Sequence, residues 1–237
     1  DISGKSRLWP SLGVELEMPT AHAQTGATHP VGPFFRNLAA VLQSRGIASR
    51  LLQAEGRDYG LGSLRGLHSL DNGYNNLESS LGVLPGGKNS LNRLADLIHE
   101  EIKDVVTALA RENAVIVNFS EHPSVLVNQD FYYAVRAPKS LYDYQINHRG
   151  WNHMAGFDAK AHNSPCTGLD FERAILFLNC LLGLTAAFIA LYANSPFEAG
   201  RLAAYKENRL TLWPRQMGCS RMSGDRKLYR MPQRPFR

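Results

Sequence analysis

The sequence is poor in the residues that mark several protein classes. It has only three cysteines, Cys166, Cys180 and Cys219, and no CxxC pair among them. This low, odd count argues against a disulfide framework and against a structural zinc site. The chain also contains no glycine-rich phosphate loop of the GxGxxG or GxxxxGK type. A nucleotide could therefore not be held by a loop of that kind.

The first residues show no basic segment followed by an apolar one, so no secretory signal is visible. Asp1 is an unusual first residue, and we expect further residues upstream. Because a signal is missing and cysteines are few, we predict a cytoplasmic location.

Charge is unevenly distributed along the chain. It has 26 Lys and Arg against 21 Asp and Glu, a net charge of +5. Residues 201–237 hold ten Lys and Arg against two Asp and Glu, a local charge of +8, which leaves −3 (5 minus 8) for the remainder. The basic character therefore belongs to the end of the chain. Aromatic residues are few there and no nucleic-acid-reading module is recognisable, so we predict no nucleic-acid partner.

Hydrophobic periodicity predicts a chain that mixes helices and strands. Helices are predicted over residues 33–45, 91–112 and 170–193. Strands are predicted over residues 11–18, 47–53, 65–72, 75–81, 114–120, 131–136 and 155–162. Pro33 and Gly46 bound the first helix, Ser90 is expected to cap the second, and Asn72-Gly73 is expected to turn between two paired strands.

An apolar run of 20 residues, Ala174 to Ala193, contains no charged residue. It is long enough to cross a bilayer. However, Asn179, Gly183 and Thr185 lower its hydrophobicity, and neither a basic cluster nor an aromatic belt marks its ends. We therefore predict a core helix surrounded by protein and no membrane partner.

Three glutamates are the strongest metal-ligand candidates. In the expected strand GVELEM, Glu15 and Glu17 project to one side and the apolar residues between them to the other. A third carboxylate, Glu78, lies in the stretch NNLESSLG. Carboxylates from separate strands commonly bind Mg²⁺ or Mn²⁺. The alternative, that each is a solvated strand residue, stays open because the spacing alone is a weak signal.

Two further segments are rich in residues that bind metal or phosphate. Residues 142–163 contain His148, Arg149, His153, Asp158, Lys160 and His162. Residues 193–214 contain Arg201, Lys206 and Arg209, whose cations suit phosphate or carboxylate oxygens. A polar loop in the first case and a basic surface patch in the second are equally compatible with the composition.

Together these stretches resemble the glutamate–cysteine ligase family, including its bacterial carboxylate–amine ligase branch. The resemblance rests on GVELEM, on NNLESSLG, and above all on ALYANSPFEAGRLAAYKENRLTLWP, and it covers about residues 11–215. It implies an α+β, glutamine-synthetase-like fold: a curved, mostly antiparallel sheet with helices packed on one face. It also implies a single catalytic-type domain over residues 1–237, which we expect to be truncated at the C-terminus.

The resemblance implies an ATP-dependent ligase of glutathione biosynthesis. Such an enzyme joins the γ-carboxylate of glutamate, or a similar acid, to an amine such as cysteine through an acyl phosphate. ATP and Mg²⁺ (or Mn²⁺) are the expected cofactors, small molecules the expected partners, and a homo-oligomer stays open. Matched residue by residue, Glu15, Glu17 and Glu78 would hold metal. Arg209 would be catalytic, and Arg201, Arg209 and Lys160 would bind the nucleotide.

One departure from the family pattern lies in GFDAKAH, where Asp158 and Lys160 replace residues that are often Gln or His in relatives. A lysine there could substitute its own charge for a metal, or it could alter the substrate. A non-enzymatic metal- and nucleotide-binding module of the same ancestry is therefore the alternative to an active ligase.

Overall fold

The structure is a computed structural model, which describes residues 11–124, 126, 128–153, 160–169 and 171–227. Its larger sheet contains β1 (Ser11–His22), β2 (Ser49–Ala54), β3 (Arg57–Ser63), β4 (Gly66–Leu70), β5 (Asn76–Pro85), β6 (Ala114–Ile116) and β7 (Asn163–Gly168). The α-helices are α1 (Phe34–Ser44), α2 (Ser90–Ala110), α3 (Gln129–Val135), α4 (Ser140–Asp143), α5 (Ala174–Tyr192) and α6 (Leu212–Met217). A small hairpin pairs β8 (Phe197–Glu198) with β9 (Arg201–Leu202).

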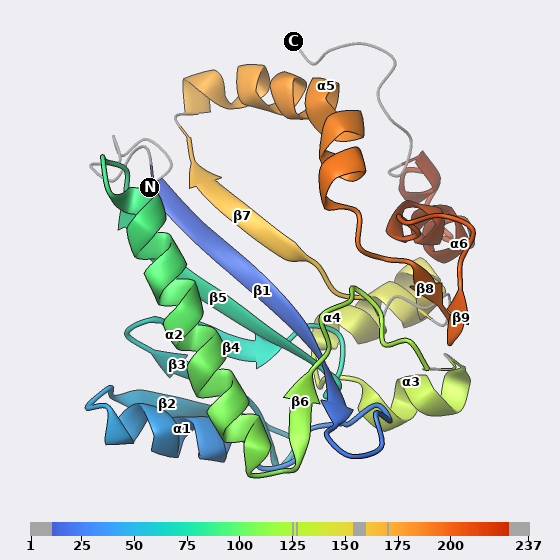
Figure 1. Cartoon of the computed structure of the whole chain (residues 1–237). Helices are drawn as coiled ribbons and strands as arrows, with labels where there is room; N and C mark the ends of the chain where they lie inside the picture. The colour runs from blue at the N-terminus through green and yellow to red at the C-terminus, as the bar shows by residue number, and fades with distance from the viewer. Residues whose placement is uncertain (1–10, 125, 127, 154–159, 170, 228–237) are drawn as a thin grey trace.

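The sheet is open, and every described strand pair in it is antiparallel. Its order is β2-β3-β4-β5-β1-β6, with β7 pairing β1 beside β6 (Figure 1). The long central strand β1 contacts β5 along one edge, and β7 and then β6 along the other. The predicted mixture of helices with a mostly antiparallel sheet is confirmed.

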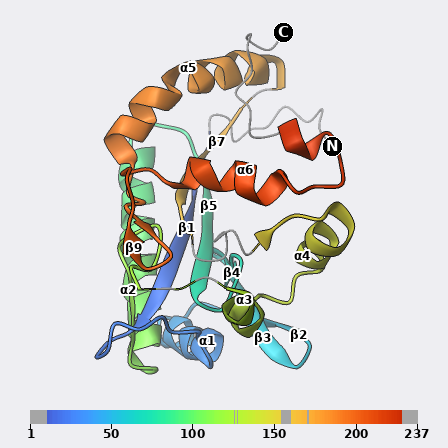
Figure 2. The same ribbon diagram turned by 90° about the vertical axis from the view of Figure 1, so that its right-hand side faces the viewer.

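One face of the sheet packs against α1 and α2. The alternation of β1 sends Val14, Leu16 and Met18 into this core. Each such side chain contributes roughly 1.5–3 kcal/mol when fully buried. Figure 2 shows α2 on one side of β1 and β5, and α3 and α4 on the other. The glutamates of β1 therefore face the side away from α2.

A buried polar group links the sheet to α2. His68 Nδ1 lies 2.8 Å from Glu101 Oε1, which also accepts a hydrogen bond from Ser79 Oγ at 2.7 Å. His68 and Glu101 are almost completely buried. This network fixes α2 over β4 and β5.

The predicted strand over residues 131–136 is wrong, because this segment forms α3. The Asn128 side chain caps the helix by accepting a hydrogen bond from the Phe131 N–H at 2.8 Å. The strand predicted over 114–120 is confirmed only for its first three residues. Most of the strand predicted over 155–162 lies outside the described residues.

Two local details also differ from expectation. Ser90 begins α2 rather than capping it, and its hydroxyl donates to the carbonyls of Pro85 and Gly87. Strand β3 was not predicted, because Gly60 and Gly62 interrupt its apolar pattern. By contrast, α1 begins just after Pro33 and ends just before Gly46, close to the predicted limits.

The prediction that the apolar run forms a core helix is wrong for the described part of the chain. The run forms α5, and none of its residues is buried. Leu176 is 63% exposed and Leu191 is 70% exposed. Residues Phe171–Tyr192 are long and apolar enough to span a bilayer by length and composition alone. A helix that is apolar on all sides is normally buried in a protein core or in a membrane.

Because the described part of the chain buries no residue of α5, charged substitutions in this helix should cost little stability. We expect Leu176→Glu and Leu184→Glu to change the free energy of unfolding by less than about 0.5 kcal/mol. The control Leu38→Ala, in the core of α1, should cost roughly 2–5 kcal/mol. Urea unfolding in detergent-free buffer measures all three. A loss of several kcal/mol in the α5 variants would show that this helix is packed in solution.

Candidate active site

Strand register brings three glutamates to one face of the sheet. Glu17 pairs directly with Glu78 across β1 and β5, and Glu15 lies two residues before Glu17. Directly opposed residues share a face, and their Cβ atoms are about 4.5–5.5 Å apart. Glu15 and Glu78 are half-buried, and the side chain of Glu17 is only 7% exposed. The expected common surface is therefore present.

The three carboxylates repel one another. Burial raises the pKa of Glu78, and the charges of Glu17 and Glu15 raise it further. Lys139 and a hydrogen bond from Ser80 act in the opposite direction. Such a face stabilises a bound cation, because a cation relieves the repulsion.

His162 is the closest described partner of Glu17. Its backbone N–H donates to Glu17 Oε2 at 2.8 Å, and its Nδ1 lies 2.8 Å from Oε1. The histidine thus orients the Glu17 carboxylate from the direction of β7. His162 was among the polar residues singled out in the sequence, but its pairing with Glu17 was not.

The glutamates do not form a complete metal-binding cage. Within the described ranges, no group of three or more His, Cys, Asp or Glu side chains could hold a metal ion. Mg²⁺, however, is usually bound by one or two carboxylates, with water and substrate phosphates completing its shell. The facing pair Glu17 and Glu78 fits that mode of binding, and Glu15 adds charge beside it.

Arg209 approaches the same face from a distant part of the sequence. It begins a short 3-10 helix, Arg209–Thr211, before α6. Burial lowers its pKa, whereas the carboxylates of Glu17, Asp71 and Glu207 favour the charged form. An arginine remains charged at neutral pH under such conditions. The fold thus brings a desolvated guanidinium into the field of the Glu17 carboxylate.

Buried hydrogen bonds fix the backbone beside Arg209. The Asn208 N–H donates to Ser195 Oγ and its Nδ2 donates to the Ser195 carbonyl, both at 2.7 Å. Glu207 Oε1 accepts from the Arg209 N–H at 2.9 Å. Ser195 therefore shapes this loop, and Asn208 is the hydrogen-bond partner that the sequence did not reveal.

Lys160 and Arg201 occupy different environments from those expected of nucleotide ligands. Lys160 is 1% exposed, forms an ion pair with Glu121, and donates to the Phe197 carbonyl at 3.0 Å. Burial lowers the pKa of Lys160 to about 8, although the carboxylates of Glu198 and Glu207 favour the ammonium form. Arg201 is exposed in β9. Lys160 therefore holds the loop after α5, and its ammonium is enclosed by protein.

The polar residues of segment 142–163 serve mainly in internal contacts. Arg149 pairs with the buried carboxylate of Asp225, which also accepts from Trp151 Nε1 at 2.8 Å. These contacts hold the pKa of Asp225 far below its usual range. His153 Nε2 lies 3.2 Å from Gln145 Oε1. Asp158 lies outside the described residues.

Comparison with known proteins identifies the family. A search of curated proteins found no match. A model of the family described as glutamate-cysteine ligase family 2 (GCS2) matches residues 53–227, which are 175 of the 237 residues. This range includes Glu78 and Arg209, and β1 with Glu15 and Glu17 precedes it. The chain therefore belongs to glutamate–cysteine ligase family 2, a family of ligases of the glutamate–cysteine ligase type.

Proposed function

We propose that the protein is an ATP-dependent ligase that joins the γ-carboxylate of glutamate, or a similar acid, to an amine such as cysteine. This reaction would place it in glutathione biosynthesis in the cytoplasm. Family membership supports the reaction class. The observation that carries the proposal is the facing pair Glu17 and Glu78 with Arg209 in the same electrostatic field. We further propose that the sheet is the glutamine-synthetase-like catalytic fold of that family.

The proposed reaction has two steps. A carboxylate oxygen of the acid attacks the γ-phosphorus of ATP, ADP leaves, and an acyl phosphate forms. The amine nitrogen then attacks the acyl carbon, phosphate leaves, and the nitrogen loses a proton. Both steps require charge neutralisation and alignment more than covalent participation by the protein.

Different side chains would bind the metal, stabilise the developing charge and position these groups. Glu17 and Glu78 would hold Mg²⁺ or Mn²⁺, which when bound neutralises charge on the nucleotide phosphates. His162 keeps the Glu17 carboxylate in place. Arg209 would stabilise the negative charge that develops on the transferring phosphoryl group. Ser195 and Asn208 fix the backbone from which Arg209 projects.

Removing the Glu78 carboxylate tests the metal role. The raised pKa means that folding disfavours the charged form, so Glu78 lowers stability at every pH above its unfolded pKa of about 4.3. At pH 7 we expect Glu78→Gln to raise the melting temperature of the ligand-free protein. The same variant should lose the joint temperature shift that Mg²⁺ and a non-hydrolysable ATP analogue produce in the wild type. Calorimetry measures both effects.

The matched control is Glu172→Gln, which removes an exposed carboxylate before α5. It should keep the wild-type melting temperature and the joint shift. If Glu78→Gln kept the joint shift, Glu78 would not be a metal ligand.

A non-enzymatic binding module is the second candidate, because the described residues do not supply a three-ligand metal site. Release of inorganic phosphate from ATP, measured with glutamate and a panel of amines, separates the two functions. Phosphate release that requires both substrates supports the ligase. A joint melting shift without phosphate release supports the module.

A further inference from the structure

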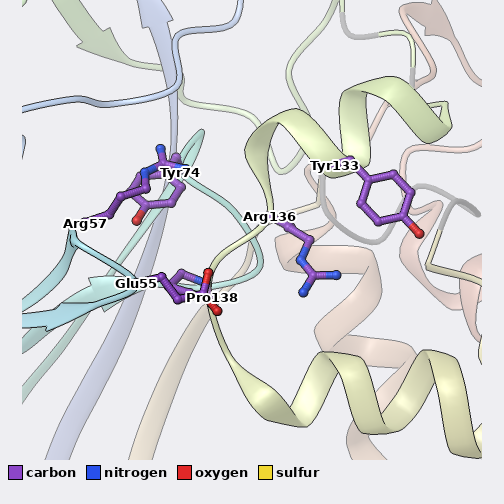
Figure 3. Close-up of a pocket in the computed structure, with 6 residues that line it drawn as sticks. All are labelled: Glu55, Arg57, Tyr74, Tyr133, Arg136 and Pro138. Carbon is purple, nitrogen blue, oxygen red and sulfur yellow. The ribbon is translucent and has the colours of Figure 1, made fainter.

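A small pocket lies at one end of the sheet, outside the candidate active site. Its lining comes from the β2–β3 turn and the start of β3, the turn before β5, and α3 with the segment after it. It comprises Glu55, Arg57, Tyr74, Tyr133, Arg136 and Pro138 (Figure 3). Its volume is about 180 Å³. Pockets for drug-sized ligands measure roughly 300–1,000 Å³, so this pocket suits a much smaller molecule than a nucleotide.

Arg57 and Tyr74 form the cationic wall of the pocket. The Arg57 guanidinium carbon lies 3.7 Å from the centre of the Tyr74 ring (Figure 3). Stacking engages the face of the guanidinium and leaves its edge N–H groups available to a carboxylate. No ion pair of Arg57 occurs with any described carboxylate.

The Tyr74 hydroxyl is a buried polar group without a hydrogen-bond partner among the described residues. Tyr74 is 2% exposed, and within the described ranges its hydroxyl makes no hydrogen bond. Burial raises the pKa of Tyr74, so the group remains a neutral donor. A buried hydroxyl without a partner costs about 1–3 kcal/mol. An acceptor supplied by a ligand would remove that cost.

Glu55 reaches the pocket from a strained turn. Glu55 and Gly56 form the two-residue loop between β2 and β3, with φ values of 52° and 75°. Loops of this type favour Asn-Gly, and a glutamate at positive φ is unusual. Backbone strain of this kind is often found at functional sites, where function rather than conformational preference determines which residue is present. Here the turn places the glutamate side chain at the pocket.

The charged side chains of the pocket that form no ion pair with a described residue indicate what kind of ligand it can bind. Arg136 is already paired with Asp143 at 2.6 Å, so its charge is balanced within the protein. One guanidinium, Arg57, and one carboxylate, Glu55, remain. We propose that this pocket binds a small zwitterionic amino acid. Its carboxylate binds Arg57 and the Tyr74 hydroxyl, and its ammonium binds Glu55. The site is separate from the carboxylate face and does not depend on the proposed ligase reaction.

Titration calorimetry of the full chain with L-alanine, without ATP or metal, tests this proposal. Propionate lacks the ammonium and ethylamine lacks the carboxylate, so both should bind at least about tenfold more weakly than L-alanine. Arg57→Gln and Tyr74→Phe should each weaken L-alanine binding. Glu55→Asn restores the preferred turn sequence, so it should keep or raise the melting temperature while weakening binding about tenfold or more.

The outcomes separate this site from the ligase site. Glu17→Gln should leave L-alanine binding unchanged, whether or not the ligase proposal holds. Absence of saturable L-alanine binding to the wild type would overturn the amino-acid site. Equal binding of propionate, or unchanged binding in both Arg57→Gln and Glu55→Asn, would also overturn it.

Discussion

Arg209→Gln is expected to lower kcat/KM for amide formation by roughly a thousandfold or more, the scale on which a charge-stabilising arginine acts in phosphoryl transfer. Arg209 is desolvated and lies in the field of Glu17, where the transferring phosphoryl group would be held. Glutamine retains hydrogen-bond donors but removes the positive charge. A coupled assay of phosphate release, with glutamate and cysteine as substrates, measures the effect.

Although Arg209→Gln should lose activity, its free energy of unfolding should not be lower than that of the wild type. Burial already lowers the pKa of Arg209, so the uncharged replacement avoids a desolvation cost. Arg93→Gln is the matched control, because Arg93 is exposed on α2, on the opposite side of the sheet. It should keep the wild-type rate. A folded Arg209→Gln variant with the wild-type rate would exclude Arg209 from the chemistry.

The common glutamate face could be predicted because strand periodicity is local. Glu15 and Glu17 share a side in any strand, and the apolar residues between them determine which side is buried. The facing of Glu17 and Glu78 required the register between β1 and β5, which the sequence alone did not provide. Its position in a second strand-like stretch already made Glu78 a candidate third ligand, and the resemblance to known ligases matched all three glutamates to metal-binding positions.

Other features depend on contacts that local sequence does not encode. FYYAVR over residues 131–136 is rich in strand-favouring residues, but the Asn128 cap and the packing of Tyr132 and Val135 make it helical. The role of Glu121 could not be predicted from the sequence, because an isolated carboxylate in a loop forms no recognisable pattern. Only the fold places it against Lys160. Similarly, apolarity alone could not show that the part of the chain described by the structure buries no residue of α5.

Lys160→Met is expected to destabilise the protein by roughly 3–5 kcal/mol, as is typical when one partner of a buried ion pair is removed. Lys160 and Glu121 are each 1% exposed, so the substitution leaves a carboxylate enclosed without its cation. Methionine preserves most of the apolar volume, which separates the charge effect from a cavity effect. Urea unfolding at pH 7 measures the change.

The double variant Lys160→Met with Glu121→Gln distinguishes an ion pair from simple packing. It removes both charges, so it should recover a large part of the lost stability. Glutamine can still accept the Ala199 N–H bond that Glu121 Oε1 accepts at 2.7 Å. Lys160 also donates to Phe197, so the pair fixes the loop that leads to Ser195 and Arg209. If the single and double variants were equally unstable, the buried charge of Glu121 would not be the cause. Lys160 would then act through packing alone.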